Sequence, residues 1–195
     1  SASGQMALQF GDTAGGVGDA GSDSCRYFVQ RFNTFAISQS GTSPNTVAKH
    51  FPTPNFYSYG NKYTVTSTTS GAGDEGNYTV LFRDHSRSGI MRRDTILVNN
   101  EGGTQSQYGL MWASGMAGNS ASNFGWQVGS CYIRVYRGAT LYLQTQVPGL
   151  RFRYNVLRSR LSTAIEFGSG YEAATNDPYF HNNTVMGKAA IYFSE

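Results

Sequence analysis

Asp84, His85 and Ser86 are the residues of this chain whose types match a hydrolytic triad. A triad is assembled from distant segments, whereas consecutive residues of an extended segment point to opposite sides. We therefore expect no nucleophilic site here. The chain also has no Gly-x-Ser-x-Gly turn and no paired Cys or His spacing typical of zinc. The sequence predicts that this protein is not an enzyme and uses no metal or cofactor.

Two glycine-rich segments, residues 16–21 and 71–76, match the pattern Gly-x-Gly-x-x-Gly. This pattern binds a phosphate only when a buried strand precedes it and a helix follows it, because the helix N-terminus supplies the backbone N–H groups. Neither segment has that context, and each contains a carboxylate where the phosphate would lie. We interpret both as turns.

Arginines gather in a segment that has no acid. No Asp or Glu occurs between Glu101 and Glu166. Three interpretations stay open: an interface with acidic segments of neighbouring subunits, contact with nucleic-acid phosphates, or an ordinary solvated strand face. The formal net charge of +3 is small for a dedicated RNA-binding protein. The candidate interface or genome-facing residues are Arg134, Arg137, Arg151, Arg153, Arg158 and Arg160.

The composition indicates strands joined by turns. The 195 residues include 24 Gly, 13 Tyr and 12 Phe, with only 14% charged residues. Aromatic residues favour strands and glycine favours turns, so one all-β domain is expected. Cys25 and Cys131 form either one bridge or, as we expect, two buried thiols in a reducing compartment. No apolar run approaches the about 18 residues of a membrane helix, so no membrane contact is expected.

The chain divides into an acidic N-terminal arm, residues 1–24, and a β domain, residues 25–195. Residues 38–61 contain three prolines and are expected to form a long loop. Period-2 alternation predicts that Tyr63 and Val65 share one face. It also groups Cys131, Ile133 and Val135, and places Phe152 with Tyr154 and Val156, opposite Arg151, Arg153 and Asn155. We expect eight to ten antiparallel strands packed as a sandwich, with no repeat of fixed period.

Two segments resemble the jelly-roll capsid proteins of picorna-like viruses of insects and algae. In the first, a Gly- and Asp-rich arm precedes Arg26, a short apolar stretch, and then Arg31 and Phe32. In the second, Tyr136 and Arg137 precede Gly138, where a glycine permits a tight bend of the chain. Ala139 follows, where the family usually has Ser or Gly.

This resemblance implies an eight-stranded viral jelly roll released from a polyprotein. Its function would be that of a structural subunit of a small icosahedral RNA-virus capsid, clustered about the five-fold axes. The implied partners are copies of itself, sibling capsid proteins, weakly the genomic RNA, and a host receptor. The implied location is the virion, and the host cytoplasm during assembly. The aromatic anchors of such a subunit would be Phe28, Phe32, Tyr136, Trp112 and Trp126.

A second function class fits the same composition. A carbohydrate-binding β-sandwich module, or a phage fibre or receptor-binding domain, presents exposed Tyr and Trp beside Asn and Asp, where rings stack on sugars. Trp112 and Trp126 are the rings expected to make that contact.

Overall fold

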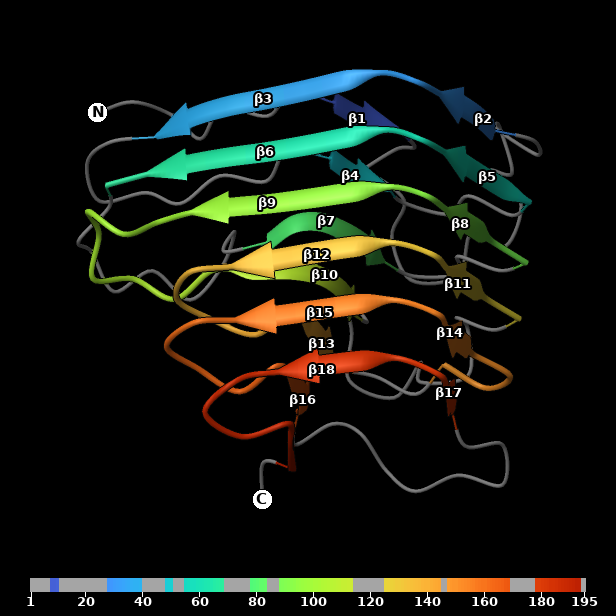
Figure 1. Ribbon diagram of the computed structural model, residues 1–195. Helices are drawn as coiled ribbons and strands as arrows, with labels where there is room; N and C mark the ends of the chain where they lie inside the picture. Colours follow the sequence, from blue (N-terminus) through green and yellow to red (C-terminus); the bar gives the residue numbers. More distant parts are fainter. Residues whose placement is uncertain are drawn as a thin grey trace, which may run out of the picture.

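The computed structural model describes residues 8–10, 28–39, 48–50, 55–68, 78–83, 88–113, 125–144, 147–168 and 178–193. These residues form nineteen β-strands in three sheets, and within each sheet every strand pair is parallel (Figure 1). The chain visits the sheets in a fixed order, A, B and then C, before it begins the next coil. This architecture is a parallel β-helix, in which each coil stacks on the one before it.

Each sheet collects one strand from each of six successive coils, and sheet A has a seventh strand, β19. Sheet A contains β1 (Leu8–Phe10), β4 (Ala48–His50), β7 (Tyr78–Arg83), β10 (Tyr108–Ala113), β13 (Leu141–Leu143), β16 (Ile165–Phe167) and β19 (Ile191–Phe193). Sheet B contains β2 (Phe28–Arg31), β5 (Phe56–Tyr59), β8 (Ile90–Arg92), β11 (Gln127–Gly129), β14 (Arg151–Arg153) and β17 (Tyr179–His181). Sheet C contains β3 (Thr34–Gln39), β6 (Lys62–Ser67), β9 (Thr95–Asn99), β12 (Tyr132–Val135), β15 (Val156–Ser159) and β18 (Thr184–Met186).

The predicted antiparallel sandwich, and with it the eight-stranded viral jelly roll, is wrong. Alternation identifies a strand and its buried face, but it carries no information on the direction of the neighbouring strand. Here each strand pairs with the strand one coil away, as in the register Tyr132↔Thr95 and Tyr132↔Val156. The expected loop at 38–61 is also wrong in part, because it includes β4 and β5. Of the expected arm, the structure describes only β1, which pairs with β4.

The repeat is present but its period varies, which hid it from the sequence. Equivalent turn residues are 28 positions apart between Asn33 and Asn61 and 33 apart between Asn61 and Asp94. The interval is 24 positions between Cys131 and Asn155 and again 28 between Asn155 and Asn183. Because the coils differ in the loops between sheets, no fixed spacing recurs along the chain.

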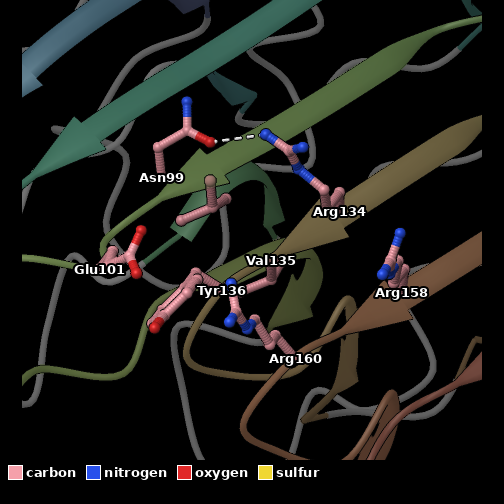
Figure 2. Close-up of a pocket in the computed structure, with 8 residues that line it drawn as sticks. Asn99, Glu101, Arg134, Val135, Tyr136, Arg158 and Arg160 are labelled. Carbon is pink, nitrogen blue, oxygen red and sulfur yellow. Dashed lines mark hydrogen bonds between the residues drawn. The ribbon is translucent and has the colours of Figure 1, made fainter.

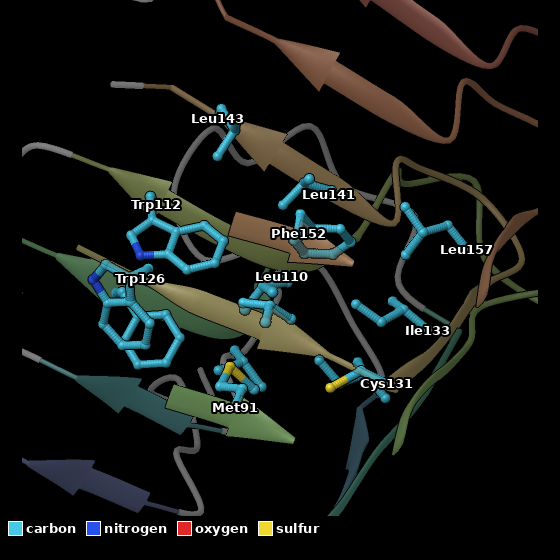
Figure 3. Packing of buried hydrophobic residues seen from close by; sticks show 14 of the residues in the cluster. Met91, Leu110, Trp112, Trp126, Cys131, Ile133, Leu141, Leu143, Phe152 and Leu157 are labelled. Carbon is cyan, nitrogen blue, oxygen red and sulfur yellow. The ribbon is translucent and has the colours of Figure 1, made fainter. Parts of the chain in front are cut away.

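The interior of the coil is filled by stacked apolar side chains. Tyr63, Ile96, Ile133 and Leu157 follow one another in register along sheet C, and all are fully buried. Between sheets A and B lies an aromatic cluster that includes Trp112, Trp126, Phe56 and Phe82 (Figure 3). The centroids of the Phe82 and Trp126 rings are 4.1 Å apart. The core is thus a column of like side chains, one layer per coil.

Both tryptophans are structural anchors, as the capsid interpretation expected. Trp112 and Trp126 are fully buried, so the alternative expectation that they stack on a sugar is wrong. Phe28 is partly buried against the core. Phe32 is 73% exposed and is therefore not an anchor. Tyr136 is half-buried and does not belong to the core cluster.

A two-residue turn joins sheet B to sheet C in every coil; we call it the B–C turn. Its first residue has a positive φ throughout, from 51° at Asn182 to 66° at Gly60, which reverses the direction of the backbone without a loop. Its second residue is buried or half-buried in the last five coils. The second residues are Asn33, Asn61, Asp94, Cys131, Asn155 and Asn183.

Hydrogen bonds link these second residues from coil to coil; we call the series the B–C ladder. The side-chain oxygen of each Asn or Asp accepts the backbone N–H of the preceding rung, for example Cys131 N–H to Asn155 Oδ1 at 2.9 Å. The amide then donates to a carbonyl of the preceding coil, as from Asn155 Nδ2 to Val128 O at 3.1 Å. Both polar ends of each buried amide are thus satisfied, which a buried amide requires.

The ladder corrects one predicted strand. Phe152 points inward as expected, but Tyr154 is 58% exposed and Asn155 is buried. The B–C turn at Tyr154 and Asn155 separates β14 from β15, and the positive φ of 59° at Tyr154 changes the phase of the alternation. Other predicted inward positions are confirmed: Tyr63 and Val65 of β6 are buried, as are Cys131 of the B–C turn and Ile133 and Val135 of β12.

Gly138 makes the bend that the sequence predicted. Its φ is +121°, a conformation that side chains rarely adopt, and a Cβ there would lie 2.0 Å from the carbonyl oxygen of Gln107. Cys131 is a buried free thiol, and burial raises its pKa to about 12, so it is unreactive. Cys25 lies outside the described residues.

Candidate ligand-binding site

The outer faces of sheets B and C are basic. The described strands of these two sheets contain no Asp or Glu, while β14 alone has Arg151 and Arg153. In contrast, β16 of sheet A carries Glu166 on its outer side, half-buried. The sequence segment that contains arginines and no acid therefore corresponds to a basic surface on sheets B and C. The arginines of the two faces and their turns are Arg31, Arg92, Arg93, Arg134, Arg151, Arg153, Arg158 and Arg160.

A shallow cleft of about 220 Å³ opens on sheet C where β9, β12 and β15 end (Figure 2). Successive coils supply its lining at equivalent positions, because the strands are parallel and in register. The charged residues of the lining are one carboxylate and three guanidinium groups. The complete lining is Val98, Asn99, Glu101, Arg134, Val135, Tyr136, Arg158 and Arg160.

Two of the guanidinium groups are held in place by neighbours. Arg134 Nη2 donates a hydrogen bond of 2.8 Å to Asn99 Oδ1 on the adjacent strand. The Arg160 guanidinium lies over the ring of Tyr136, 5.0 Å from its centroid. An exposed cation–π contact of this kind contributes about 0.5–1 kcal/mol. Both contacts orient the side chains without neutralising their charge.

Arg158 and Glu101 are not paired. Within the described part of the chain Arg158 has no hydrogen-bond partner, and Figure 2 shows it apart from the other labelled side chains. Glu101 is exposed and forms no ion pair with the three guanidinium groups among the described residues. The cleft therefore presents free donors and a free acceptor to solvent.

Arg134 and Arg158 occupy directly adjacent positions in neighbouring strands. Like charges side by side on a sheet destabilise it, by up to about 1 kcal/mol. Folding alone gives no reason to place them together. A pair that is unfavourable for stability is typical of a functional site, where an anionic ligand relieves the repulsion.

The other predicted arginines lie elsewhere. Arg151 and Arg153 are on the outer face of sheet B, in register with Gln127 and Gly129 of β11. Arg137 is half-buried in the turn after β12, where Asn100 binds its backbone N–H and carbonyl at 2.9 and 2.7 Å. The structure thus brings together Arg134, Arg158 and Arg160 but not the other three.

Of the residues predicted to form family motifs, Arg31 and Phe32 lie at the first described B–C turn, and Arg26 lies outside the described residues. The Arg31 guanidinium is 5.2 Å from the centroid of the Tyr57 ring. One coil further, Arg93 donates a 2.7 Å hydrogen bond to the Tyr59 hydroxyl and lies over that ring. Arginines that rest on tyrosines thus recur in two successive coils at the end of the sheet B strands. Asp84, His85, Ser86 and both glycine-rich segments are outside the described residues.

The outer face of sheet A differs in chemistry. Tyr78, Tyr108 and Tyr142 stack on one another there, with centroids 6.2 and 4.6 Å apart. Burial raises the pKa of Tyr108 and of Tyr142, and the charge of Glu166 raises both further. Burial also raises the pKa of Glu166 itself. The face is therefore apolar and packed, with its rings turned to one another.

No protein-family model matches the chain, and searches of curated proteins and of solved structures return no match. Among the described residues, no group of three His, Cys, Asp or Glu side chains is arranged to hold a metal ion. None of the described segments is a helix long and apolar enough to span a membrane.

Sequence reasoning missed two sets of residues. Asn99 and Glu101 complete the cleft, but nothing in their local sequence distinguishes them from other loop residues. The B–C ladder did leave a signal, since Asn33, Asn61 and Asn183 are each followed by one outward residue and then an inward apolar one. Alignment of the chain on its asparagines would have exposed the repeat.

Proposed function

We propose that this protein is a binding protein for an anionic polysaccharide, which lies against the basic outer faces of sheets B and C. The observation that carries the proposal is the cleft, whose lining combines three guanidinium groups with one unpaired carboxylate. Guanidinium groups bind carboxylates and sulfates through charge-assisted hydrogen bonds. A carboxylate accepts hydrogen bonds from hydroxyl groups, which a polysaccharide supplies in number.

A nucleic acid fits the same surface less well. Glu101 would repel its phosphates as it would the carboxylates of a polysaccharide, but the deoxyribose of DNA has no free hydroxyl within the chain to donate to Glu101. Single-stranded nucleic acid also needs ring faces on which its bases stack. The rings of Tyr57, Tyr59 and Tyr136 carry Arg31, Arg93 and Arg160, and the exposed rings of Phe32, Tyr154 and Tyr179 do not line the cleft. These contacts favour a polymer that is bound through its charges and hydroxyls.

The experiment is isothermal titration of the folded chain with polygalacturonate, a neutral glucan and a single-stranded oligonucleotide. We expect binding of polygalacturonate that weakens as salt rises from 50 to about 500 mM, because screening shortens the reach of surface charges. The neutral glucan should not bind. Tighter binding of the oligonucleotide than of polygalacturonate would contradict the proposal.

A charge-neutralised variant ties the binding to sheet B as well. Arg151→Gln should lower the affinity for polygalacturonate about tenfold and reduce its salt dependence. Lys188→Gln, an exposed position after β18, is the matched control and should bind as the wild type does. Equal losses in both variants would show that only net charge matters.

The capsid function predicted from the family resemblance stays a prediction. It depended on a jelly roll, which the parallel β-helix replaces, so the geometry favours a binding protein. Electron microscopy of the native source tests the capsid role directly. An icosahedral shell that contains this chain would restore it, together with the expected requirement for Arg151 and Arg153 in assembly.

A further inference from the structure

We infer that the cleft at the ends of β9, β12 and β15 recognises a single hexuronic acid unit, with Arg134 and Arg158 on its carboxylate and Glu101 on its hydroxyls. This inference rests on the proposed function and names the sugar that the site selects. It concerns binding alone and involves no covalent step.

The carboxylate position follows from the strand register. Arg134 and Arg158 are neighbours on parallel strands, which lie about 4.8 Å apart. One planar carboxylate between them takes hydrogen bonds from both guanidinium groups and removes their mutual repulsion. The 2.8 Å hydrogen bond to Asn99 holds the Arg134 guanidinium toward β9, on the side away from Arg158, so the ligand carboxylate binds the N–H groups of Arg134 that this bond leaves free.

The position of the sugar hydroxyls follows from Glu101, the one carboxylate that lines the cleft. Glu101 lines the same cleft as the three guanidinium groups, yet it pairs with none of them among the described residues. A ligand that carries only negative groups would be repelled by Glu101. A sugar acid presents a carboxylate at one side of its ring and hydroxyl donors at the others, which matches both kinds of group in the cleft.

Arg160 and Tyr136 close the remaining side. The Arg160 guanidinium lies 5.0 Å from the centroid of the Tyr136 ring, and the two side chains together line this side of the cleft. The three guanidinium charges exceed the single carboxylate charge, so the empty cleft has a formal net charge of +2 (three minus one). The site therefore attracts an anion while it keeps one acceptor for hydroxyls.

Polyacrylate is the probe that separates these two contributions, because it carries carboxylates without hydroxyls. Glu101→Gln should weaken binding of polygalacturonate about tenfold, since a charged acceptor for the hydroxyls is lost. The same variant should strengthen binding of polyacrylate, since a repulsive charge is removed. Stronger binding of both polymers would overturn the inference, because it would show that charge alone decides.

Two further measurements complete the test. Arg158→Gln should weaken both polymers about tenfold, and methyl-esterified polygalacturonate, which lacks the charge, should bind the wild type poorly. Dextran sulfate distinguishes a sulfate from a carboxylate; if it binds tighter than polygalacturonate, the assignment of a uronate is wrong. Lys188→Gln serves again as the control, and thermal unfolding verifies that each variant is folded.

The outcomes separate this inference from the proposed function. If the wild type binds no polygalacturonate, the proposed function fails. If the wild type binds it and Glu101→Gln and Arg158→Gln both bind as the wild type does, the polysaccharide lies elsewhere on the basic faces, and only the inference fails.

Discussion

The B–C ladder and the cleft are built in the same way, but the polar groups of the ladder are hydrogen-bonded to one another and those of the cleft are largely unpaired. Each takes one position from successive coils and stacks equivalent polar side chains in register. Inside, the Asn155 amide accepts the Cys131 N–H and donates to Asn183 Oδ1 and Val128 O, so its donor and its acceptor are both satisfied by neighbouring coils. Outside, Arg134 and Arg158 are donors only and repel. Stacking in parallel register therefore stabilises asparagines, because each amide can donate to one neighbour and accept from another. Stacked arginines can only donate, so they stay available to bind a ligand.

Removal of a ladder amide should have the largest effect on stability. Asn155→Ala leaves the N–H of Cys131 and the carbonyl of Val128 without the partners shown at 2.9 and 3.1 Å. Each unsatisfied buried group costs about 1–3 kcal/mol, so we expect the two groups together to lower the free energy of unfolding by about 2–6 kcal/mol in urea unfolding. Asn99→Ala in the cleft is the matched control and should cost less than about 0.5 kcal/mol. A similar loss of unfolding free energy in both variants would show that the ladder residues do not stabilise the fold more than the cleft residues do.

The next largest effect concerns Asp94, the rung of the ladder that carries an acid. Its Oδ1 accepts the Asn61 backbone N–H at 2.7 Å, while Oδ2 is buried without a hydrogen bond in the described structure. Burial raises the pKa of Asp94 from 3.8 to about 6, although hydrogen bonds from Ser58 and Asn61 oppose the rise. The folded protein thus keeps a proton that the unfolded chain loses between these two values.

Stability should therefore fall as the pH rises through the window from about 4 to 6, because the unfolded state binds fewer protons there. The fall due to this one group is about 3 kcal/mol at most. Asp94→Asn removes the charge and should be more stable than the wild type at pH 7, by about 1–3 kcal/mol, with little difference at pH 4. Urea unfolding at both pH values measures this. An equal difference at the two pH values would assign the pH dependence to another group.

The smallest effect is expected at the cleft itself. Arg134→Gln relieves the repulsion from Arg158 and should change the free energy of unfolding by less than about 1 kcal/mol, toward higher stability. The same variant should bind polygalacturonate about tenfold less tightly. Chemical denaturation and titration of one preparation test both statements. A destabilised variant would mean that Arg134 supports the fold, as the ladder residues do.

Much of the strand content could be predicted, since alternation is a local property. The buried faces of β6 and β12 follow from Tyr63, Val65, Ile133 and Val135, and the structure confirms them. Alternation failed across Tyr154 and Asn155 because the positive φ of a two-residue turn shifts its phase. The prediction of the sheet failed for a different reason, since the partner of each strand lies one coil away along a chain of variable coil length.

The candidate site was predictable only in part. The arginines stood out because no acid occurs between Glu101 and Glu166, yet that segment of sequence runs over three sheets. Register alone decides that Arg134 and Arg158 occupy adjacent positions on sheet C while Arg151 and Arg153 lie on sheet B. It also places Asn99 beside Arg134, although they are 35 residues apart in the chain.

The sequence by itself determined an all-β chain, the inward residues within each strand, the bend at Gly138 and the excess of arginine. Each of these depends on neighbouring residues, which the sequence records directly. Only the tertiary structure decided that the strands are parallel, that asparagines form a ladder and that Glu101 joins three arginines in one cleft. These features depend on contacts between coils. The hydrogen bonds that stabilise them join residues 24 to 37 positions apart, which is beyond the range of any local sequence pattern.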